Sequence, residues 1–304
     1  MDRVQVLDNL IDAFNLGHPD FHGTHLLRKY EQKAAKANAV TIGCEVEVRF
    51  KSYFPELYAK YLEDTSYERL SNKQKLNFGA EVTEAERPLQ ELLAKSAQCG
   101  VPKGKDRYYE FANAPVHHPY TLTVELGLLR DAGLIPKGVK HPLHITIGGL
   151  GHSQDVGFML MTLELLGYTS PSRIWDVAVS DKAVAWARKG RAGMRERSAA
   201  ELSLGATKAI ELRTLELPET QTGIENLFGL THRMATIISG KGTDQDVLRL
   251  ARVWEELAEI GHVHDIDVYS NWGRPYDNPQ IWIDFANKLP NIDTSTLKEL
   301  VNEL

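Results

Sequence analysis

The chain has 304 residues, of which 42% are hydrophobic and 25% charged, a composition typical of a globular protein with a large core. The net charge of −6 argues against a general nucleic-acid coat protein, because phosphate binding needs a basic excess. No stretch holds the roughly eighteen apolar residues that a membrane helix needs, and residues 1–15 do not resemble a signal peptide. With only Cys44 and Cys99 as cysteines, these features predict a cytoplasmic protein without disulfides and without a membrane partner.

The N-terminal part of the chain predicts two helices before the first strand. Apolar side chains between residues 7 and 14 recur on one helical face, and residues 28–38 are charged and alanine-rich. We therefore expect residues 1–38 to form a helical cap. Residues 41–50 then alternate apolar and polar side chains with period two, which predicts a strand.

Two strand–turn–helix units follow a polar helical segment at residues 67–98, which Pro88 is expected to limit or kink. In the first unit a strand at 107–112 precedes a helix at 119–131, closed by glycine 133; in the second a strand at 143–147 precedes a helix at 154–166, stopped by glycine 167. A fourth strand at 208–217 ends at proline 218. Helices are predicted at 221–239 and 244–260, an edge strand at 262–268, and two short helices around proline 290.

The chain has no repeats, low-complexity linker or change of composition that would mark a domain boundary. We expect one domain over residues 1–304, with the cap at 1–38, a sheet with helices at 39–218, and a mostly helical part at 219–304. Strands separated by helices of varied length predict an α+β fold around one sheet.

All four predicted strands place a charged or metal-ligating side chain on one face and apolar side chains on the other. If the strands are neighbours, that face combines several carboxylates with an imidazole and a guanidinium. Clusters of carboxylates bind Mg²⁺ or Mn²⁺ and suit phosphoryl transfer. The residues are Glu45, Glu47, Glu110, His144, Glu211 and Arg213.

The alternative is a solvated strand face, where charges need no further cause. Two features favour a site. Glu45 and Glu47 place like charges close together, which is repulsive without a cation between them. Gly148 follows His144 on the same face, where a missing side chain would let a ligand approach.

Four short motifs in this order resemble the amidoligase family, within the carboxylate–amine ligase superfamily of glutamine synthetase and glutamate–cysteine ligase. Residues 43–47 (Gly-Cys-Glu-Val-Glu) are similar to its Gly-x-Glu-x-Glu strand, and Glu110 precedes proline 115 and a helix as in its second strand. Residues 144–148 resemble its His-x-His-x-Gly strand, and 211–213 its Glu-x-Arg strand. The matched order spans about residues 41–217.

The resemblance implies a curved, mainly antiparallel sheet with flanking helices, like the catalytic domain of glutamine synthetase. It implies an enzyme that binds ATP and Mg²⁺ or Mn²⁺, phosphorylates the carboxylate of one small-molecule substrate, and forms an amide with the amine of the other. Metal ligands by position are Glu45, Glu47, Glu110, His144 and Glu211, and the expected catalytic residues are Glu47, Glu211 and Arg213, whose guanidinium suits phosphoryl oxygens. The sequence leaves a homo-oligomer open.

The cofactor-binding residues are expected to be Thr146, Gly148, Arg195 and Arg197. Thr146 stands where the family has its second histidine, a departure that puts ATP use in question. Arg195 and Arg197 belong to a basic, glycine-punctuated segment that either closes over phosphates or is a solvated loop. A metal-dependent amide hydrolase on the same scaffold, or a non-catalytic binding protein, therefore remain as alternatives to the ligase.

Further histidines could bind a metal outside this sheet, and one thiol lies near the site. His18, His22 and His25 form one group, and His262 and His264 another, on the predicted edge strand; exposed loop histidines are the simpler interpretation of each. Cys44 alternates onto the apolar face, which predicts a core residue rather than a nucleophile.

Overall fold

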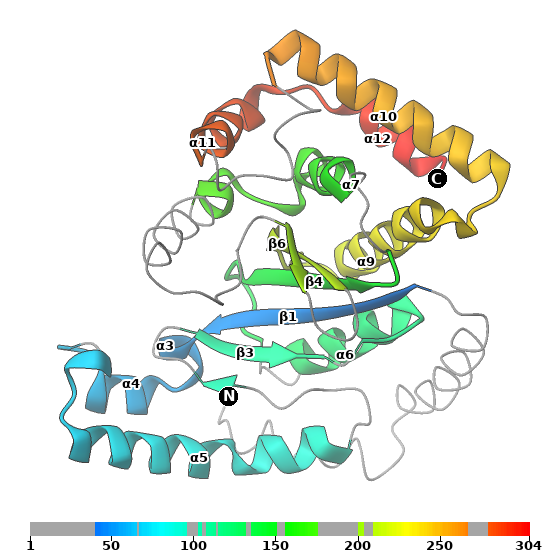
Figure 1. The fold of residues 1–304 in the computed structure, drawn as a ribbon. Helices are drawn as coiled ribbons and strands as arrows, with labels where there is room; N and C mark the ends of the chain where they lie inside the picture. The colour runs from blue at the N-terminus through cyan, green and yellow to red at the C-terminus, as the bar shows by residue number, and fades with distance from the viewer. Residues whose placement is uncertain are drawn as a thin grey trace.

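The computed structural model describes ten segments of the chain, which carry the predicted sheet and most of the helices (Figure 1). The helical cap predicted at 1–38, the histidines at 18, 22 and 25, and Arg195 and Arg197 lie outside the described residues. The segments are 40–65, 67–95, 103–104, 108–113, 115–131, 135–150, 156–175, 200–203, 209–266 and 279–304.

Six strands form one antiparallel sheet in the order β2-β3-β1-β4-β6-β5. The four predicted strands are its four central ones: β3 (Tyr108–Ala112), β1 (Thr41–Arg49), β4 (Pro142–Gly148) and β6 (Ala209–Glu216). Short edge strands not predicted from the sequence flank them, β2 (Lys103–Gly104) and β5 (Ala200–Ser203). The prediction of an α+β fold with an antiparallel sheet is confirmed.

Helices surround the sheet and join its strands. Between β1 and β3 lie α3 (Phe50–Tyr53), α4 (Pro55–Tyr61), η1 (Tyr67–Arg69) and α5 (Asn72–Lys95). Between β3 and β6 lie α6 (Pro119–Asp131), α7 (Val156–Leu163) and η2 (Glu164–Tyr168). After β6 come α9 (Gln221–Thr236), η3 (Ile237–Lys241), α10 (Asp244–His264), α11 (Pro279–Lys288), η4 (Leu289–Asn291) and α12 (Ser295–Asn302). In Figure 1, α4 and α5 lie on the β3 side of the sheet, and α10 to α12 lie on the opposite side.

One prediction from the sequence is wrong in detail. The expected edge strand at 262–268 is not formed at its start, because α10 continues to His264 and ends where Asp265 adopts a left-handed conformation with φ 52°. Of the two outcomes expected at Pro88, a limit to the helix is not seen, since α5 runs on to Lys95. No helix in the described segments is both long and apolar enough to cross a membrane.

The core lies against the apolar face of the sheet. On β1, the side chains of Ile42, Cys44, Val46 and Val48 are at most 2% exposed, as the alternation predicted. They belong to one cluster with apolar residues of α6 and α9, helices that contact each other and β1. Burial of this face leaves the opposite face of the strands as the one open to polar chemistry.

One carboxyl group is buried where η2 meets β6. Glu164 is 0% exposed, and its Oε1 accepts a hydrogen bond from the Thr214 hydroxyl at 2.5 Å. Within the described segments, no group bonds its Oε2. Burial raises the pKa of Glu164 to about 8, although the Thr214 bond acts in the opposite direction. The side chain is therefore mainly neutral at pH 7.

We predict that Glu164→Gln stabilises the protein at neutral and alkaline pH. The folded state binds this proton more tightly than the unfolded chain, so the wild type loses at most about 1.4 kcal/mol per pH unit as pH rises from about 4.5 to about 8. Glutamine keeps the acceptor for Thr214 and has no charge to bury. Urea unfolding should show a gain of up to about 3 kcal/mol at pH 7 and less than about 1 kcal/mol at pH 5.

The matched control is Glu225→Gln on the exposed side of α9, which removes the same charge without burial. It should change the free energy of unfolding by less than about 0.5 kcal/mol at either pH. An equal gain for Glu164→Gln at both pH values would contradict a titrating buried carboxyl.

Candidate metal and phosphate site

The antiparallel register brings the predicted polar residues onto one face of the sheet. Glu45 pairs with His144 across β1 and β4, and Glu47 pairs with Glu110 across β1 and β3. Thr146 pairs with Glu211 across β4 and β6. Directly paired residues of antiparallel strands project from the same face. The hypothesis of one shared polar face is therefore confirmed for the backbone positions of these residues.

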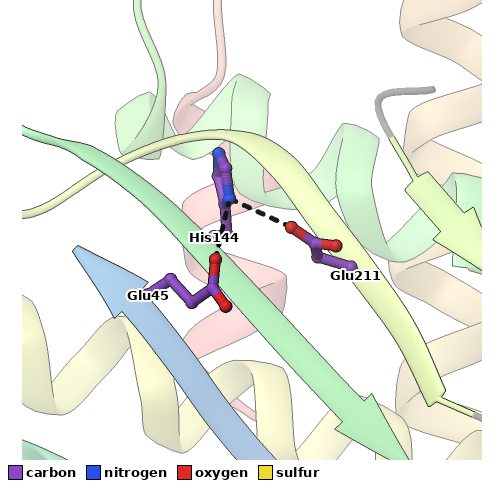
Figure 2. A group of neighbouring side chains, drawn as sticks. All are labelled: Glu45, His144 and Glu211. Carbon is purple, nitrogen blue, oxygen red and sulfur yellow. Dashed lines mark ion pairs between the residues drawn. The ribbon is translucent and has the colours of Figure 1, made fainter. Parts of the chain in front are cut away.

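His144 is the centre of the cluster (Figure 2). Its Nδ1 lies 3.0 Å from Glu211 Oε1 and 3.7 Å from Glu45 Oε2, and its Nε2 lies 3.8 Å from Glu47 Oε1. The imidazole is 4% exposed, whereas the side chains of Glu45 and Glu211 are 38% and 26% exposed. A buried imidazole thus lies beneath carboxylates that reach solvent, where a substrate could meet them.

A bulge in β6 places Arg213 beside this cluster. Leu143 of β4 pairs with Leu215, but Ile145 pairs with Leu212, so two residues of β6, Arg213 and Thr214, lie opposite His144 alone. Arg213 Nε lies 3.7 Å from Glu211 Oε1, and its side chain is 15% exposed. The positively charged side chain of Arg213 therefore lies next to the carboxylates rather than in solvent.

Arg173 is a member of the site that the sequence analysis did not identify. One terminal nitrogen of its guanidinium lies 2.9 Å from His144 Nε2 and donates to the main-chain oxygen of Arg213 at 2.8 Å. Arg173 belongs to a helical turn at 171–175, whose start is capped by the Ser170 hydroxyl. The Ser-Pro pair at 170–171 is a sequence signal for a helix start, but no local pattern indicates contact with a residue 29 positions earlier.

Opposing influences act on the protonation of His144. Burial disfavours the charged imidazolium, but Glu211 and Glu45, followed by Glu47, outweigh burial and raise the pKa of His144 above its usual value. Arg173 acts against a second proton on the ring, because its guanidinium can only donate to Nε2. The carboxylates thus favour the charged form of the ring, whereas the contact with Arg173 needs a lone pair on Nε2.

Other predicted site residues are less closely associated with His144. Thr146 is half-buried on the same face, opposite Glu211. A Cβ at Gly148 would collide with the Thr41 hydroxyl, so Thr41 takes up the space that we expected a ligand to use. The side chain of Glu110 lies outside the described part of the structure, although its backbone pairs with Glu47.

The remaining candidates do not join this site. Cys44 is buried on the apolar face, and its thiol contacts Asn113 Oδ1 at 3.4 Å, which confirms a core position. His262 and His264 lie in the last turn of α10 rather than on a strand. His262 is exposed and His264 half-buried, and they do not form one strand face as predicted.

Glu45, His144 and Glu211 are suited to binding a divalent cation. One ligand atom from each, two carboxylate oxygens and an imidazole nitrogen, lies within 4.8 Å of the others. Carboxylates suit Mg²⁺ and Mn²⁺, whereas an imidazole ligand favours transition metals over Mg²⁺. The donor set therefore fits Mn²⁺ better than Mg²⁺. With three protein ligands, such an ion would keep positions open for water or substrate.

No protein-family model matches the chain, and no curated protein matches its sequence.

We predict that Mn²⁺ raises the melting temperature of the protein more than Mg²⁺ does at equal concentration. A cation that binds only the folded site stabilises it by mass action, and the imidazole nitrogen favours Mn²⁺. Glu45→Gln and Glu211→Gln should each remove most of the shift, because each removes a charged ligand. Differential scanning fluorimetry with each ion measures the effect.

Glu219→Gln is the control, since Glu219 is exposed in the loop after β6 and carries the same charge. Its Mn²⁺ shift should equal that of the wild type. A shift that survives in Glu45→Gln and Glu211→Gln alike would place the ion elsewhere in the protein.

Proposed function

We propose that the protein is an ATP-dependent carbon–nitrogen ligase that joins a small carboxylate to an amine through an acyl phosphate. The observation that carries the proposal is one sheet face that brings together Glu45, Glu47, His144, Glu211 and Arg213. The strands β3, β1, β4 and β6 form an antiparallel sheet, the kind of sheet that the resemblance of the four motifs implies. We extend the proposal to that fold, and to Mg²⁺ or Mn²⁺ as the cofactor.

In this proposal the carboxylates and the imidazole hold the metal, which neutralises phosphoryl oxygens of ATP when it is bound. Arg213 binds an oxygen of the transferring phosphoryl group and offsets charge that develops there. The substrate carboxylate attacks the γ-phosphorus and ADP leaves; the amine then attacks the acyl carbon, phosphate leaves, and the nitrogen loses a proton. The roles of Glu45, Glu211 and His144 are binding and orientation.

The burial of two key side chains supports a site over a solvated strand face. The side chain of Glu47 is 12% exposed and that of Arg213 is 15% exposed. Charged side chains without a task are mostly exposed, because burying a charge is costly. A function for these charges accounts for that cost.

A ligase of this type should release ADP and phosphate only when both substrates are present. The assay incubates the protein with ATP, Mg²⁺ or Mn²⁺, and mixtures of amino acids or polyamines, and measures both products. Phosphate release from ATP alone would count against the proposal. Glu211→Gln should abolish the release, whereas Glu219→Gln should not.

The second candidate is a metal-dependent amide hydrolase, which Thr146 favours because it replaces the histidine of the resembled motif. A hydrolase needs the cation but no nucleotide. ATP with Mg²⁺ should therefore stabilise a ligase more than Mg²⁺ alone does, but should add nothing for a hydrolase. Thermal unfolding in the two mixtures separates the candidates.

We predict that Glu47→Gln weakens cation binding and that Arg213→Lys slows turnover, with both proteins folded. Glutamine keeps the shape of Glu47 but loses its charge. Lysine keeps the charge of Arg213 but loses the planar fork, so turnover should fall at least about tenfold while nucleotide affinity changes less than about threefold. Calorimetric titration and the product assay measure the two effects.

Arg233→Lys on α9 is the matched control, because Arg233 is an exposed arginine paired with Asp246. It should leave turnover unchanged. Normal activity in both site variants would mean that Glu47 and Arg213 have no role in catalysis. Loss of folding in both would mean that the face is structural.

A further inference from the structure

The bulge in β6 is bound by the segment that follows η2. β5 pairs with β6 only before the bulge, and beyond it Thr169 forms an antiparallel bridge with Leu215. The Thr169 hydroxyl also donates to the main-chain oxygen of Thr214. The Arg173 guanidinium donates to the main-chain oxygen of Arg213 at 2.8 Å. Both carbonyl groups of the bulged pair therefore accept a hydrogen bond from this segment.

The bond from Thr169 is made at the peptide group that decides where Arg213 points. In a bulge the ladder is locally disrupted, and the bulge can redirect a side chain. Thr214 and Leu215 are both 0% exposed, although strict alternation would place only one of them in the core. The break in alternation thus falls at the peptide group between them, whose oxygen Thr169 binds. This orientation of the peptide group leaves Arg213 on the polar face.

We propose that Thr169 is a positioning residue for the proposed ligase reaction: its hydroxyl holds the bulge in the conformation that keeps the Arg213 guanidinium beside Glu211. This inference rests on the role of Arg213 in phosphoryl transfer, which is part of the proposed function. Arg213 Nε lies 3.7 Å from Glu211 Oε1. Within the described segments, the Thr169 side chain bonds β6 and none of the metal ligands. It therefore acts on the site through the backbone alone.

Burial makes the hydrogen bond of Thr169 important for the backbone around it. Thr169 is 7% exposed and Thr214 is 0% exposed. A buried carbonyl group that loses its partner is costly, so the peptide group is expected to rotate toward another donor. The rest of the segment stays attached, because the Ser170 hydroxyl donates to Glu216 Oε1 at 2.7 Å. Loss of the Thr169 hydroxyl therefore changes the bulge rather than the whole segment.

Thr169→Val keeps the shape of the side chain and removes the hydroxyl. Turnover should fall at least about tenfold, because a small displacement of the charge that stabilises the transition state is costly. Calorimetric Mn²⁺ affinity should stay within about threefold of the wild type, since Glu45, His144 and Glu211 lie before the bulge or on other strands. Thr169→Ser retains the hydroxyl and should restore turnover to within about threefold of the wild type.

Thr231→Val on α9 is the matched control. Thr231 is 0% exposed, and its hydroxyl donates to the main-chain oxygen of Leu227 at 2.7 Å. The substitution likewise removes a buried hydroxyl from a main-chain oxygen, but in a helix that packs against the apolar face of the sheet. Turnover should not change. Equal loss of turnover in the two valine variants would assign the effect to general stability and overturn the inference.

A double-mutant cycle tests whether Thr169 acts through Arg213. In the Arg213→Lys background the planar guanidinium is already lost, so that Thr169→Val should lower turnover further by less than about twofold. A further loss as large as that in the wild-type background would mean that the two residues act independently. That result would overturn the inference.

The position of Arg213 can also be followed without the reaction. Its Nε atom is buried, so in ¹⁵N-arginine-labelled protein the Nε–H should exchange slowly with water, and Arg213→Lys assigns the signal. Thr169→Val should accelerate this exchange at least about tenfold. Thr169→Ser and Thr231→Val should leave the exchange rate within about threefold of the wild type.

The two measurements distinguish this inference from the proposed function. Absence of turnover in the wild type would overturn the ligase proposal, whereas faster exchange at Arg213 in Thr169→Val would still support positioning by Thr169. Unchanged exchange in that variant would overturn the inference whether or not the protein is a ligase. If Thr169→Val did not fold, Thr169→Cys would replace it, because a thiol is a weaker donor than a hydroxyl. Unchanged exchange in Thr169→Cys would then overturn the inference.

Discussion

Repulsion among carboxylates on one sheet face is the constraint on which the rest of this site depends. Glu45, Glu47 and Glu211 all lie within 3.8 Å of one imidazole, so their charges are crowded together. Such a cluster persists only if positive charge offsets it. Arg213 and Arg173 supply that charge, the first beside Glu211 and the second at His144 Nε2. The bulge in β6 sets Arg213 opposite His144, and Arg173 donates to the main-chain oxygen of Arg213.

The bulge connects the core, the site and the segment that carries Arg173. At the bulge in β6 the Thr214 hydroxyl donates to Glu164 Oε1, and the main-chain oxygen of Arg213 accepts from Arg173. The neutral carboxyl of Glu164 thus joins η2 to the sheet from within the core. On the other side of the bulge, Thr169 and Ser170 attach the next segment to Leu215 and Glu216. Contacts to the core and to the site therefore meet at this part of β6.

The charges on this sheet face suit the binding of both a cation and a phosphate. A cluster with two open carboxylates and a buried nitrogen attracts cations, and the neighbouring guanidinium attracts phosphoryl oxygens. A divalent ion would offset the negative charge of the carboxylates, and a phosphate bound beside it would offset the positive charges of the ion and of the guanidinium. This complementarity is what makes phosphoryl transfer from ATP the function that we propose for this face.

The sequence by itself determined the four central strands and the composition of their two faces, because alternation with period two is a local property of β1 and its neighbours. It also identified Cys44 as a core residue. It assigned six residues to the polar face: Glu45, Glu47, Glu110, His144, Glu211 and Arg213. It misjudged residues 262–264, which belong to α10 rather than to a strand. Strand order, the register that sets Glu45 against His144, and the contact of Arg173 with that histidine were decided only by the tertiary structure. Those features depend on pairings between distant parts of the chain, for which a single sequence carries no local signal.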